Sequence, residues 1–320
     1  MLCGFEPHSI YLILAKTTGV GSMLSDLENL LRSIRKKDVV YVPNGGNAGD
    51  SFIAHATYQL FGRVGLNFQL GNLSGIYPRR VIICGGGGNL VKPYPNMVDF
   101  LRRNMGQWQQ LVILPHTIRA YEDTLRQFGS NCFVFCREKP SFDFVVGSSP
   151  QATVFLSHDL ALSCDFTETK EQIVDRWTHD LRDRVLLIRN AKRLVRTLNY
   201  GLLNPGRKKI LNALRTDVEE TTIDIPGSNI DLSDAFAADD MSPASSLYAT
   251  YWTMRFIDRF KIVRTNRLHI GIMSAMLGKQ VCLLDNSYGK VRDVFDHSLR
   301  DQFPNVLWQG DVDNRDRGES

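Results

Sequence analysis

The sequence lacks the cysteine spacing of a structural metal site. Its six cysteines are scattered without a C-x-x-C pair, and two near neighbours, Cys132 and Cys136, lie in the apolar run CFVFC. Zinc sites draw their ligands from closely spaced Cys and His residues. Cysteines inside apolar strands are instead typical small buried side chains of a reducing compartment. We therefore expect no metal ion and a cytoplasmic location.

Long hydrophobic runs are also absent. No stretch reaches the roughly 20 apolar residues that a membrane-spanning helix requires. The apolar residues 10–15 (IYLILA) follow Glu6 and His8 without a basic segment before them, which argues against a signal peptide. We expect neither a membrane-spanning helix nor a signal peptide.

Positive charge is not concentrated in one place. The formal net charge is only +4, and the basic clusters 192–193 and 207–209 are too short to form a nucleic-acid surface. This mild charge suits an anionic substrate or a loose contact with an anionic membrane. The segment 189–196 and the helix expected around Trp252 are candidates for peripheral contact with a membrane or a glycan; a solvated face and a buried helix are the alternatives.

What the chain does contain is a recurring unit of apolar strand, polar or glycine-rich turn, and helix. Five strands are expected in the first half, at residues 38–42, 80–84, 111–114, 132–136 and 154–156. The first is preceded by a helix at 23–35 and followed by one at 52–60, capped by Asp50 or Ser51. This alternation predicts an α/β fold with a doubly wound parallel sheet and a site at the carboxyl edge.

A charged segment that begins at Glu168 predicts a domain boundary, with one domain over residues 1–167 and a second over 168–320. For the second domain we expect a loop at 231–244 and a frayed tail at 311–320. The strands expected there are 184–188, 221–225, 261–263, 280–284 and 305–307, and the helices 208–214 and 247–257.

The stretch from Lys261 to Lys290 carries the strongest candidate site. A short strand turns at Arg264-Thr265-Asn266 into a helix that begins at Arg267-Leu268-His269 and ends before Gly278. A helix N-terminus attracts anions, Arg adds a planar fork for carboxylate or phosphate, and His exchanges protons near neutral pH. The simpler interpretation is that Arg267 forms an ion pair at the surface and that His269 forms a hydrogen bond to a loop.

Two glycine-rich turns in the first half are candidates for close ligand approach. They are Asn44–Ser51, which includes Gly46, Asn47 and Asp50, and Gly85–Asn89, which includes Gly87. The first turn is neither G-x-G-x-x-G nor a P-loop, since no Lys-Ser/Thr follows its glycines. A turn that needs glycine only for positive φ is the alternative.

Taken together, the ordered motifs GGNAGD, GGGGN, LPHT, CREKPSF, SHDLAL and RLHIGIMSAMLGK, followed by Asp285-Asn286, resemble the polysaccharide pyruvyl transferase family from Asn44 to Lys290. The resemblance implies two Rossmann-like doubly wound domains facing a cleft, similar to the GT-B glycosyltransferase fold. It also implies that phosphoenolpyruvate donates its three-carbon unit to two hydroxyls of one sugar, forming a ketal and releasing phosphate. No cofactor and no metal are expected. Leu160 stands where the family more usually has proline.

The same resemblance assigns the donor to Arg137 and Arg267, with Leu268 in the R-L-H motif, and the general acid to His269. His116 is a candidate for a second proton-transfer or binding role, with a structural hydrogen bond as the alternative. Asp50 is expected to accept protons or orient sugar hydroxyls, or else to cap a helix.

Further substrate contacts are expected from residues of the glycine-rich turns. Two later residues are expected to close the donor site. The residues concerned are Gly46, Asn47, Gly87, Asn89, Asn286 and Lys290. Asp159 is a second carboxylate that is expected to accept protons or orient sugar hydroxyls, or else to be a turn residue. For Lys290 the alternative is a solvated lysine at the surface.

Two other functions remain open at this point. A glycosyltransferase of similar fold would use a nucleotide sugar and hold its ribose by a carboxylate, for which Glu219 or Glu220 are weak candidates. A non-catalytic binding protein is disfavoured because Arg137, Arg267 and His269 are all present. Family acceptors are sugars of extracellular or cell-wall polysaccharides, often lipid-linked at the inner membrane face.

Overall fold

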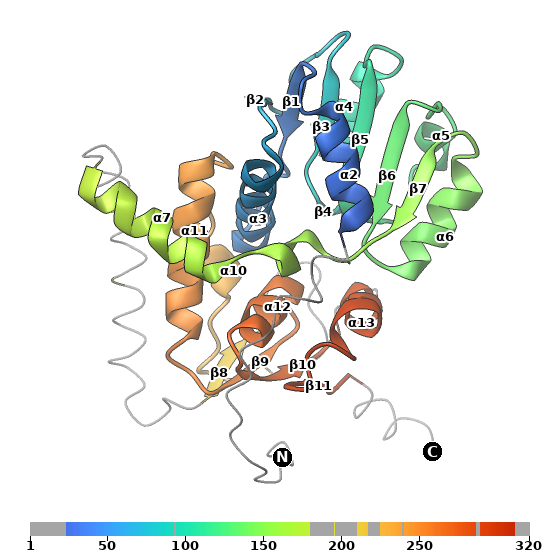
Figure 1. The fold of residues 1–320 in the computed structure, drawn as a ribbon. Coiled ribbons are helices and arrows are strands. Elements are labelled where there is room, and N and C mark those ends of the chain that lie inside the picture. The colour runs from blue at the N-terminus through green and yellow to red at the C-terminus, as the bar shows by residue number, and fades with distance from the viewer. Residues whose placement is uncertain are drawn as a thin grey trace, which may run out of the picture.

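The computed structural model describes residues 24–92, 94–179, 195, 210–216, 225–238, 240–285 and 289–310. Within them the chain forms two parallel sheets with helices packed around them (Figure 1). The predicted strand 184–188 and tail 311–320 lie outside the described residues, and of 221–225 only Ile225 is described, outside any strand.

The first sheet has the order β2-β1-β3-β5-β6-β7, with β4 paired to β5. All its pairings are parallel. Its strands are β1 (Val39–Val42), β2 (Gln69–Leu70), β3 (Val81–Cys84), β4 (Gly87–Leu90), β5 (Gln110–Ile118), β6 (Cys132–Cys136) and β7 (Thr153–Leu156).

Apolar side chains bury both faces of this sheet. In β1, Val39 and Tyr41 join one apolar cluster, while Val40 and Val42 join another. This separation follows from the two-residue period of a strand and is typical of a parallel sheet covered by helices on both sides. The helices are α2 (Ser25–Ile34), α3 (Ala48–Val64), α4 (Asn96–Asn104), α5 (Glu122–Leu125) and α6 (Lys139–Ser148).

The second sheet has the order β11-β10-β9-β8 and is also parallel. Its strands are β8 (Ile210–Ala213), β9 (Ile262–Thr265), β10 (Gln280–Leu283) and β11 (Val306–Trp308). The helical segments after β7 are η1 (Leu160–Ser163), α7 (Phe166–His179), α10 (Leu232–Ala235), α11 (Pro243–Ile257), α12 (Leu268–Met276), α13 (Lys290–Val294) and the π-helical η2 (Phe295–Leu299).

Helices α12 and α13 lie between the two sheets in Figure 1, and several bonds join the halves of the chain. Tyr58 of α3 donates to the backbone carbonyl of Met241, and Arg119 donates to Asp293 of α13 over 2.6 Å. The predicted domain boundary, between residues 167 and 168, lies in the first turn of α7. The division at that point stays a prediction.

Four details of the predicted elements are wrong. The helix expected at 208–214 is strand β8 over residues 210–213: Leu211 and Ala213 are buried on alternate positions, and β8 pairs with β9. A segment of four residues (ILNA) is short enough to fit both periods, and pairing with β9 decides for the strand. The loop expected at 231–244 contains α10 and the start of α11, which Ser242 caps.

The other two corrections concern the edge where the site lies. Helix α3 begins at Ala48, not Phe52, and Asn47 is its cap, because Asn47 and Asp50 satisfy each other's backbone N–H groups in a capping box. Strand β5 continues through Pro115-His116-Thr117, since His116 pairs with Gly87 of β4 and Cys136 of β6. The turn expected after Leu114 is therefore part of the strand.

Candidate active site

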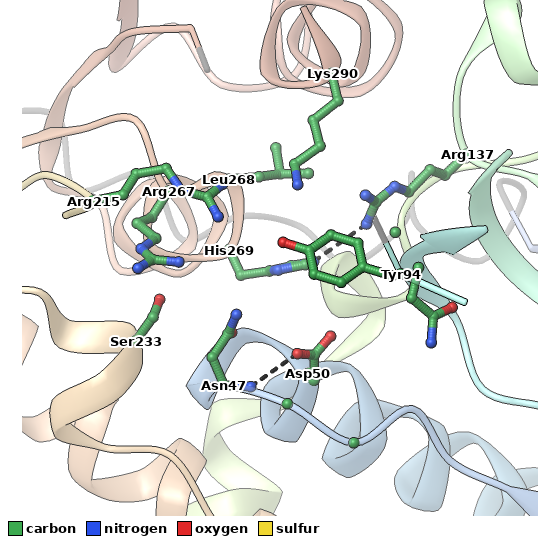
Figure 2. A pocket seen from close by; sticks show the side chains of 14 residues that line it. Asn47, Asp50, Tyr94, Arg137, Arg215, Ser233, Arg267, Leu268, His269 and Lys290 are labelled. Atoms are coloured by element: carbon green, nitrogen blue, oxygen red, sulfur yellow. Dashed lines mark hydrogen bonds between the residues drawn. The ribbon is translucent and has the colours of Figure 1, made fainter. Parts of the chain in front are cut away.

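A cavity of about 170 Å³ lies where the turns of the two sheets meet (Figure 2). It receives side chains from both halves of the chain. Its lining residues are Gly45, Gly46, Asn47, Asp50, Gly88, Asn89, Tyr94, Arg137, Arg215, Ser233, Arg267, Leu268, His269 and Lys290.

The start of α3 forms one wall of the cavity. The side chain of Asn47 accepts a hydrogen bond from the N–H of Gly49 over 2.8 Å, and Asp50 accepts one from the N–H of Asn47 over 2.9 Å. Burial raises the pKa of Asp50, and His269, Lys290 and Arg137 oppose that shift. Asp50 is therefore both the capping residue that the sequence allowed and a carboxyl group exposed to the cavity.

The second glycine-rich turn forms strand β4 next to α3. Gly87 has a φ of +139°, a conformation that residues with a side chain disfavour. A Cβ on Gly88 would lie 3.0 Å from Nη2 of Arg137, so the backbone approaches that guanidinium closely. Asn89 lines the cavity and donates from its side chain to Asn44. Gly87 itself does not line the cavity.

His116 is fully buried in β5 and does not line the cavity. Its Nδ1 lies 3.2 Å from the carbonyl oxygen of Gly85, and its Nε2 lies 3.1 Å from the backbone N–H of Asn89. The first bond needs a protonated Nδ1 and the second an unprotonated Nε2, so the ring is neutral. Burial, with help from Arg137, lowers the pKa of His116 to about 3. This geometry favours the structural alternative, in which His116 fixes the glycine turn.

Arg137, at the end of β6, is held in a buried ion pair. Its Nη1 lies 2.8 Å from Oδ2 of Asp159, and its Nε donates to the hydroxyl of Thr117 over 2.9 Å. Arg137 and Asp159 are each 1% exposed. Burial acts to raise the pKa of Asp159, but His269 and Arg137 outweigh it and hold that pKa well below its usual range. Asp159 therefore stays ionised.

His269 reaches this pair from the opposite half of the chain. Its Nε2 lies 3.3 Å from Oδ2 of Asp159 and 3.5 Å from Nη1 of Arg137. When protonated, Nε2 donates to the carboxylate; when unprotonated, it accepts from the guanidinium. Asp159 is nearly inaccessible and does not line the cavity; besides these two side chains, its Oδ1 accepts from the backbone N–H of Ala161 over 2.9 Å, which is the turn role given as the alternative.

Arg267 is the N-cap residue of α12 and enters the cavity from the second sheet. Its backbone N–H donates to Thr265 over 3.0 Å, and its Nη2 donates to Asp231. Leu268, in the first turn of the same helix, also lines the cavity. Lys290, the first residue of α13, extends into the cavity from above in Figure 2. Asn286 lies outside the described residues.

Three cavity residues were not predicted from the sequence: Tyr94, Arg215 and Ser233. Arg215 follows β8, which the sequence assigned to a helix, so the carboxyl end of that strand went unrecognised. Its signal is the change from the mostly apolar residues 210–214 to Arg215-Thr216. Tyr94, after strand β4, and Ser233, in the short α10, carry no comparable signal.

Positively charged groups dominate the lining of the cavity. Three arginines and Lys290 face Asp50, the single acidic residue among the lining residues. The N-termini of α3 and α12 add partial positive charge, because both helices begin at the cavity. Such a site suits a small substrate with several negative charges and places a histidine beside it.

Among the described residues, no group of three or more His, Cys, Asp or Glu side chains is arranged to hold a metal ion. Searched over the same residues, the helices include none that is long and apolar enough to cross a membrane.

The parallel sheets and the cavity define an α/β protein with a cation-rich site at strand ends. A sequence model of the family described as polysaccharide pyruvyl transferase matches residues 47–288, which include every lining residue except Gly45, Gly46 and Lys290. The chain belongs to the polysaccharide pyruvyl transferase family.

One relative and one solved structure extend this result over most of the chain. The chain is 26% identical over 310 residues to "Putative pyruvyl transferase EpsO" of Bacillus subtilis (strain 168), covering 89% of this chain and 92% of that protein. It is also similar to the crystal structure of a functionally uncharacterised protein, KP1_0663, from Klebsiella pneumoniae subsp. pneumoniae NTUH-K2044. That match has a TM-score of 0.70 and 28% identity, and covers 90% of this chain and 98% of the other. The family and the relative's name support a pyruvyl transferase.

Proposed function

We propose that the protein transfers the enolpyruvyl unit of phosphoenolpyruvate to a sugar of a polysaccharide or of its lipid-linked precursor. The product is a pyruvate ketal, and phosphate is released. The observation that carries this proposal is the convergence of Arg137, Arg267 and His269, from two separate sheets, on one small cation-rich cavity.

The charge of the cavity supports this donor. Phosphoenolpyruvate carries a carboxylate and a phosphate on three carbons, so its site needs several cations or N–H donors within a small volume. Arg137, Arg267 and Lys290 supply cations, and the N-termini of α3 and α12 supply N–H groups.

The proposed reaction assigns a proton donor and a proton acceptor. His269 protonates the methylene carbon of the donor, which leaves an oxocarbenium-like centre at the neighbouring carbon. One sugar hydroxyl adds to that carbon and loses its proton; the bond to the phosphate oxygen then breaks, and a second hydroxyl adds and loses its proton. Asp50 lines the cavity and accepts such protons or orients the hydroxyls.

Asp159 supports this role of His269 without touching the substrate. Its carboxylate holds Nε2 of His269 on one side and Arg137 on the other. The ionised carboxylate fixes the direction of the imidazole. The ring that gives the proton and the guanidinium that binds the donor are thereby oriented by one carboxylate.

Residues 1–167 and 168–320 form two Rossmann-like domains that face a cleft, as in the GT-B fold, with the donor bound between them. The acceptor is a glycan or a lipid-linked glycan that enters the same cleft. The protein acts in the cytoplasm, with peripheral contact at the inner membrane face when the acceptor is lipid-linked, and the reaction needs no cofactor.

A test is to mix the full-length protein with phosphoenolpyruvate and a panel of hexosides or a lipid-linked glycan extract. Acceptor-dependent phosphate release, with a product mass that matches a pyruvyl ketal, is the expected result. His269→Ala is the matched control, expected to bind the donor without turnover. Melting curves with phosphoenolpyruvate, UDP-sugars and GDP-sugars complete the test. Stabilisation by a nucleotide sugar alone would favour the glycosyltransferase alternative.

A further inference from the structure

Basic side chains enter the cavity from two opposite sides. Figure 2 shows Arg137 on one side, and Arg215, Arg267 and Ser233 together on the other, with His269 between them. The family motifs that identify the site include Arg137, Arg267 and His269, but neither Arg215 nor Ser233. These two residues need an explanation of their own.

Arg215 is fixed in place by the turn that carries it. Its backbone N–H donates to the side chain of Asn266 over 2.8 Å, next to Arg267 in sequence. The preceding Leu214 exchanges two hydrogen bonds with the side chain of Asn229, of 2.8 and 3.0 Å. Arg215 is only 6% exposed although it lines the cavity. A buried arginine whose backbone is held in this way presents its planar, charged guanidinium to the cavity from a fixed position.

Asp231 ties Arg267 and Ser233 into the same structure. One of its oxygens accepts from Nη2 of Arg267, and the other accepts from the backbone N–H of Ser233 over 3.2 Å. The first oxygen also accepts from the N–H of Thr216, the residue after Arg215. A single carboxylate thus sets the relative positions of the three segments that carry Arg215, Ser233 and Arg267.

The two sides of the cavity differ in the donors that they present. Nε and Nη1 of Arg137 are bound to Thr117 and Asp159, while its Nη2 lies beside Gly88 in the cavity lining. The opposite side brings together two guanidinium groups and a hydroxyl, and there the Nη2 of Arg267 donates to Asp231. A phosphate has three terminal oxygens and a charge near −2, whereas a carboxylate has two oxygens and one charge. The larger donor set suits the phosphate.

We propose that Arg215 and Ser233, with Arg267, form the subsite for the donor's phosphate group, and that Arg137 takes its carboxylate. This inference rests on the proposed function, since it divides the two anionic groups of phosphoenolpyruvate between the two sides. It places the reacting carbons between them, beside His269. It also places the departing phosphate at Arg215, Arg267 and Ser233, away from the Arg137 side.

The test uses two probes that separate the anionic groups: inorganic phosphate, and pyruvate as a carboxylate without phosphate. Their affinities are measured by titration calorimetry on the full chain, with Arg215→Ala, Arg215→Lys, Ser233→Ala and, as a matched control, Arg255→Ala. Arg255 is exposed on α11 and does not line the cavity.

We expect Arg215→Ala to weaken phosphate binding by about tenfold to a hundredfold, the range for a lost hydrogen bond to a charged group. Ser233→Ala should weaken it by about twofold to tenfold. Arg215→Lys should retain part of the affinity, because it keeps the charge and loses the fork. Pyruvate binding should be unchanged in all of them, and Arg255→Ala should behave as wild type.

Three results would overturn the inference: wild type that does not bind phosphate, Arg215→Ala with unchanged phosphate affinity, or equal losses for phosphate and pyruvate. If Arg215→Ala does not fold, Arg215→Lys and Ser233→Ala decide by the same criteria. Ketal formation with an unchanged KM for phosphoenolpyruvate in the Arg215 variants would defeat the subsite and leave the function intact. Arg215-dependent phosphate binding without ketal formation from any acceptor would defeat the function and leave the anion subsite.

Discussion

The imidazole of His269 lies against Gly49 in the first turn of α3. A Cβ on Gly49 would lie 2.6 Å from Nδ1 of His269 and 3.1 Å from its Cβ. The two residues belong to opposite halves of the chain, so this contact joins the helix after the first strand to the R-L-H motif. The position of the proposed general acid therefore depends on the absence of a side chain at Gly49.

Gly49→Ala should displace His269 and lower kcat strongly while the protein still folds. A misplacement of about 1 Å at a reacting group costs on the order of a hundredfold in rate. Gly62→Ala is the control in the same helix, because Gly62 is exposed and a Cβ there meets nothing within 4 Å. That control should keep kcat and raise stability by about 0.5–1 kcal/mol. Equal kcat in the two variants would mean that the contact with Gly49 does not position His269.

Much of this site could be predicted from the sequence because its parts follow local rules. Arg137 comes directly after the apolar run CFVFC, Arg267 comes two residues after the end of β9, and the carboxyl ends of parallel strands meet at one edge of a sheet. Asn47 could have been predicted as the cap of α3, since Asp50 three residues later completes the capping box. The glycine before Asp50 is typical of a turn, so the start of the helix was predicted too late in the chain.

What could not be predicted depends on tertiary contacts. The change to polar residues at Arg215 marks the end of an element but does not tell a strand from a helix; β8 is a strand because it pairs with β9, so Arg215 was not recognised at a strand end. Asp159 follows β7 in a turn, and only the fold brings Arg137 and His269 to its carboxylate. The burial of His116 also depends on pairing, because β5 extends through it to reach β4 and β6.

Asp159→Asn should impair both the stability and the rate. The substitution keeps the shape but removes the charge that balances the buried Arg137, and breaking such a pair costs up to about 3–5 kcal/mol. It also removes the carboxylate that orients His269, so kcat should fall. Asp296→Asn is the matched control: Asp296 is 41% exposed and pairs with Arg292 and Arg300 at the surface. Its effect should stay below about 1 kcal/mol, with no change in kcat.

The measurements for this pair of variants are chemical unfolding and steady-state kinetics with phosphoenolpyruvate. A stability loss in Asp159→Asn with an unchanged kcat would show that the carboxylate serves Arg137 alone. Similar unfolding curves for Asp159→Asn and Asp296→Asn would contradict the importance of the buried ion pair.

His116→Gln and His269→Gln should separate a structural from a catalytic histidine by one and the same substitution. Glutamine at residue 116 can still accept from the N–H of Asn89, so kcat should stay within about tenfold while the melting temperature falls. At residue 269 the loss of a general acid should lower kcat by about 10²–10⁴-fold. Steady-state kinetics and thermal melts of both variants test this. A comparable kcat loss in His116→Gln would restore the second proton-transfer role for that residue.

The stability of the protein should fall between neutral pH and about pH 4. Burial lowers the pKa of His55 to about 4 and that of His116 to about 3, and burial together with His297 lowers that of His158 to about 4. In the unfolded chain these side chains accept protons near pH 6.5. Over the intervening range the unfolded state binds more protons, so acid favours unfolding, by on the order of 1–3 kcal/mol for each histidine.

His158→Asn should reduce this pH dependence. His158 stacks on His297 with ring centroids 4.5 Å apart, and its Nδ1 lies 2.9 Å from the hydroxyl of Ser298. Asparagine can keep a hydrogen bond to that hydroxyl but does not titrate. One of the three histidine contributions to the pH dependence of the unfolding free energy therefore disappears. Chemical unfolding at several values between pH 7 and pH 4.5 should therefore give a shallower loss of stability in the variant than in wild type. Parallel profiles would mean that His158 accepts a proton equally well in the folded and unfolded chains, in which case its stacked position does not oppose protonation.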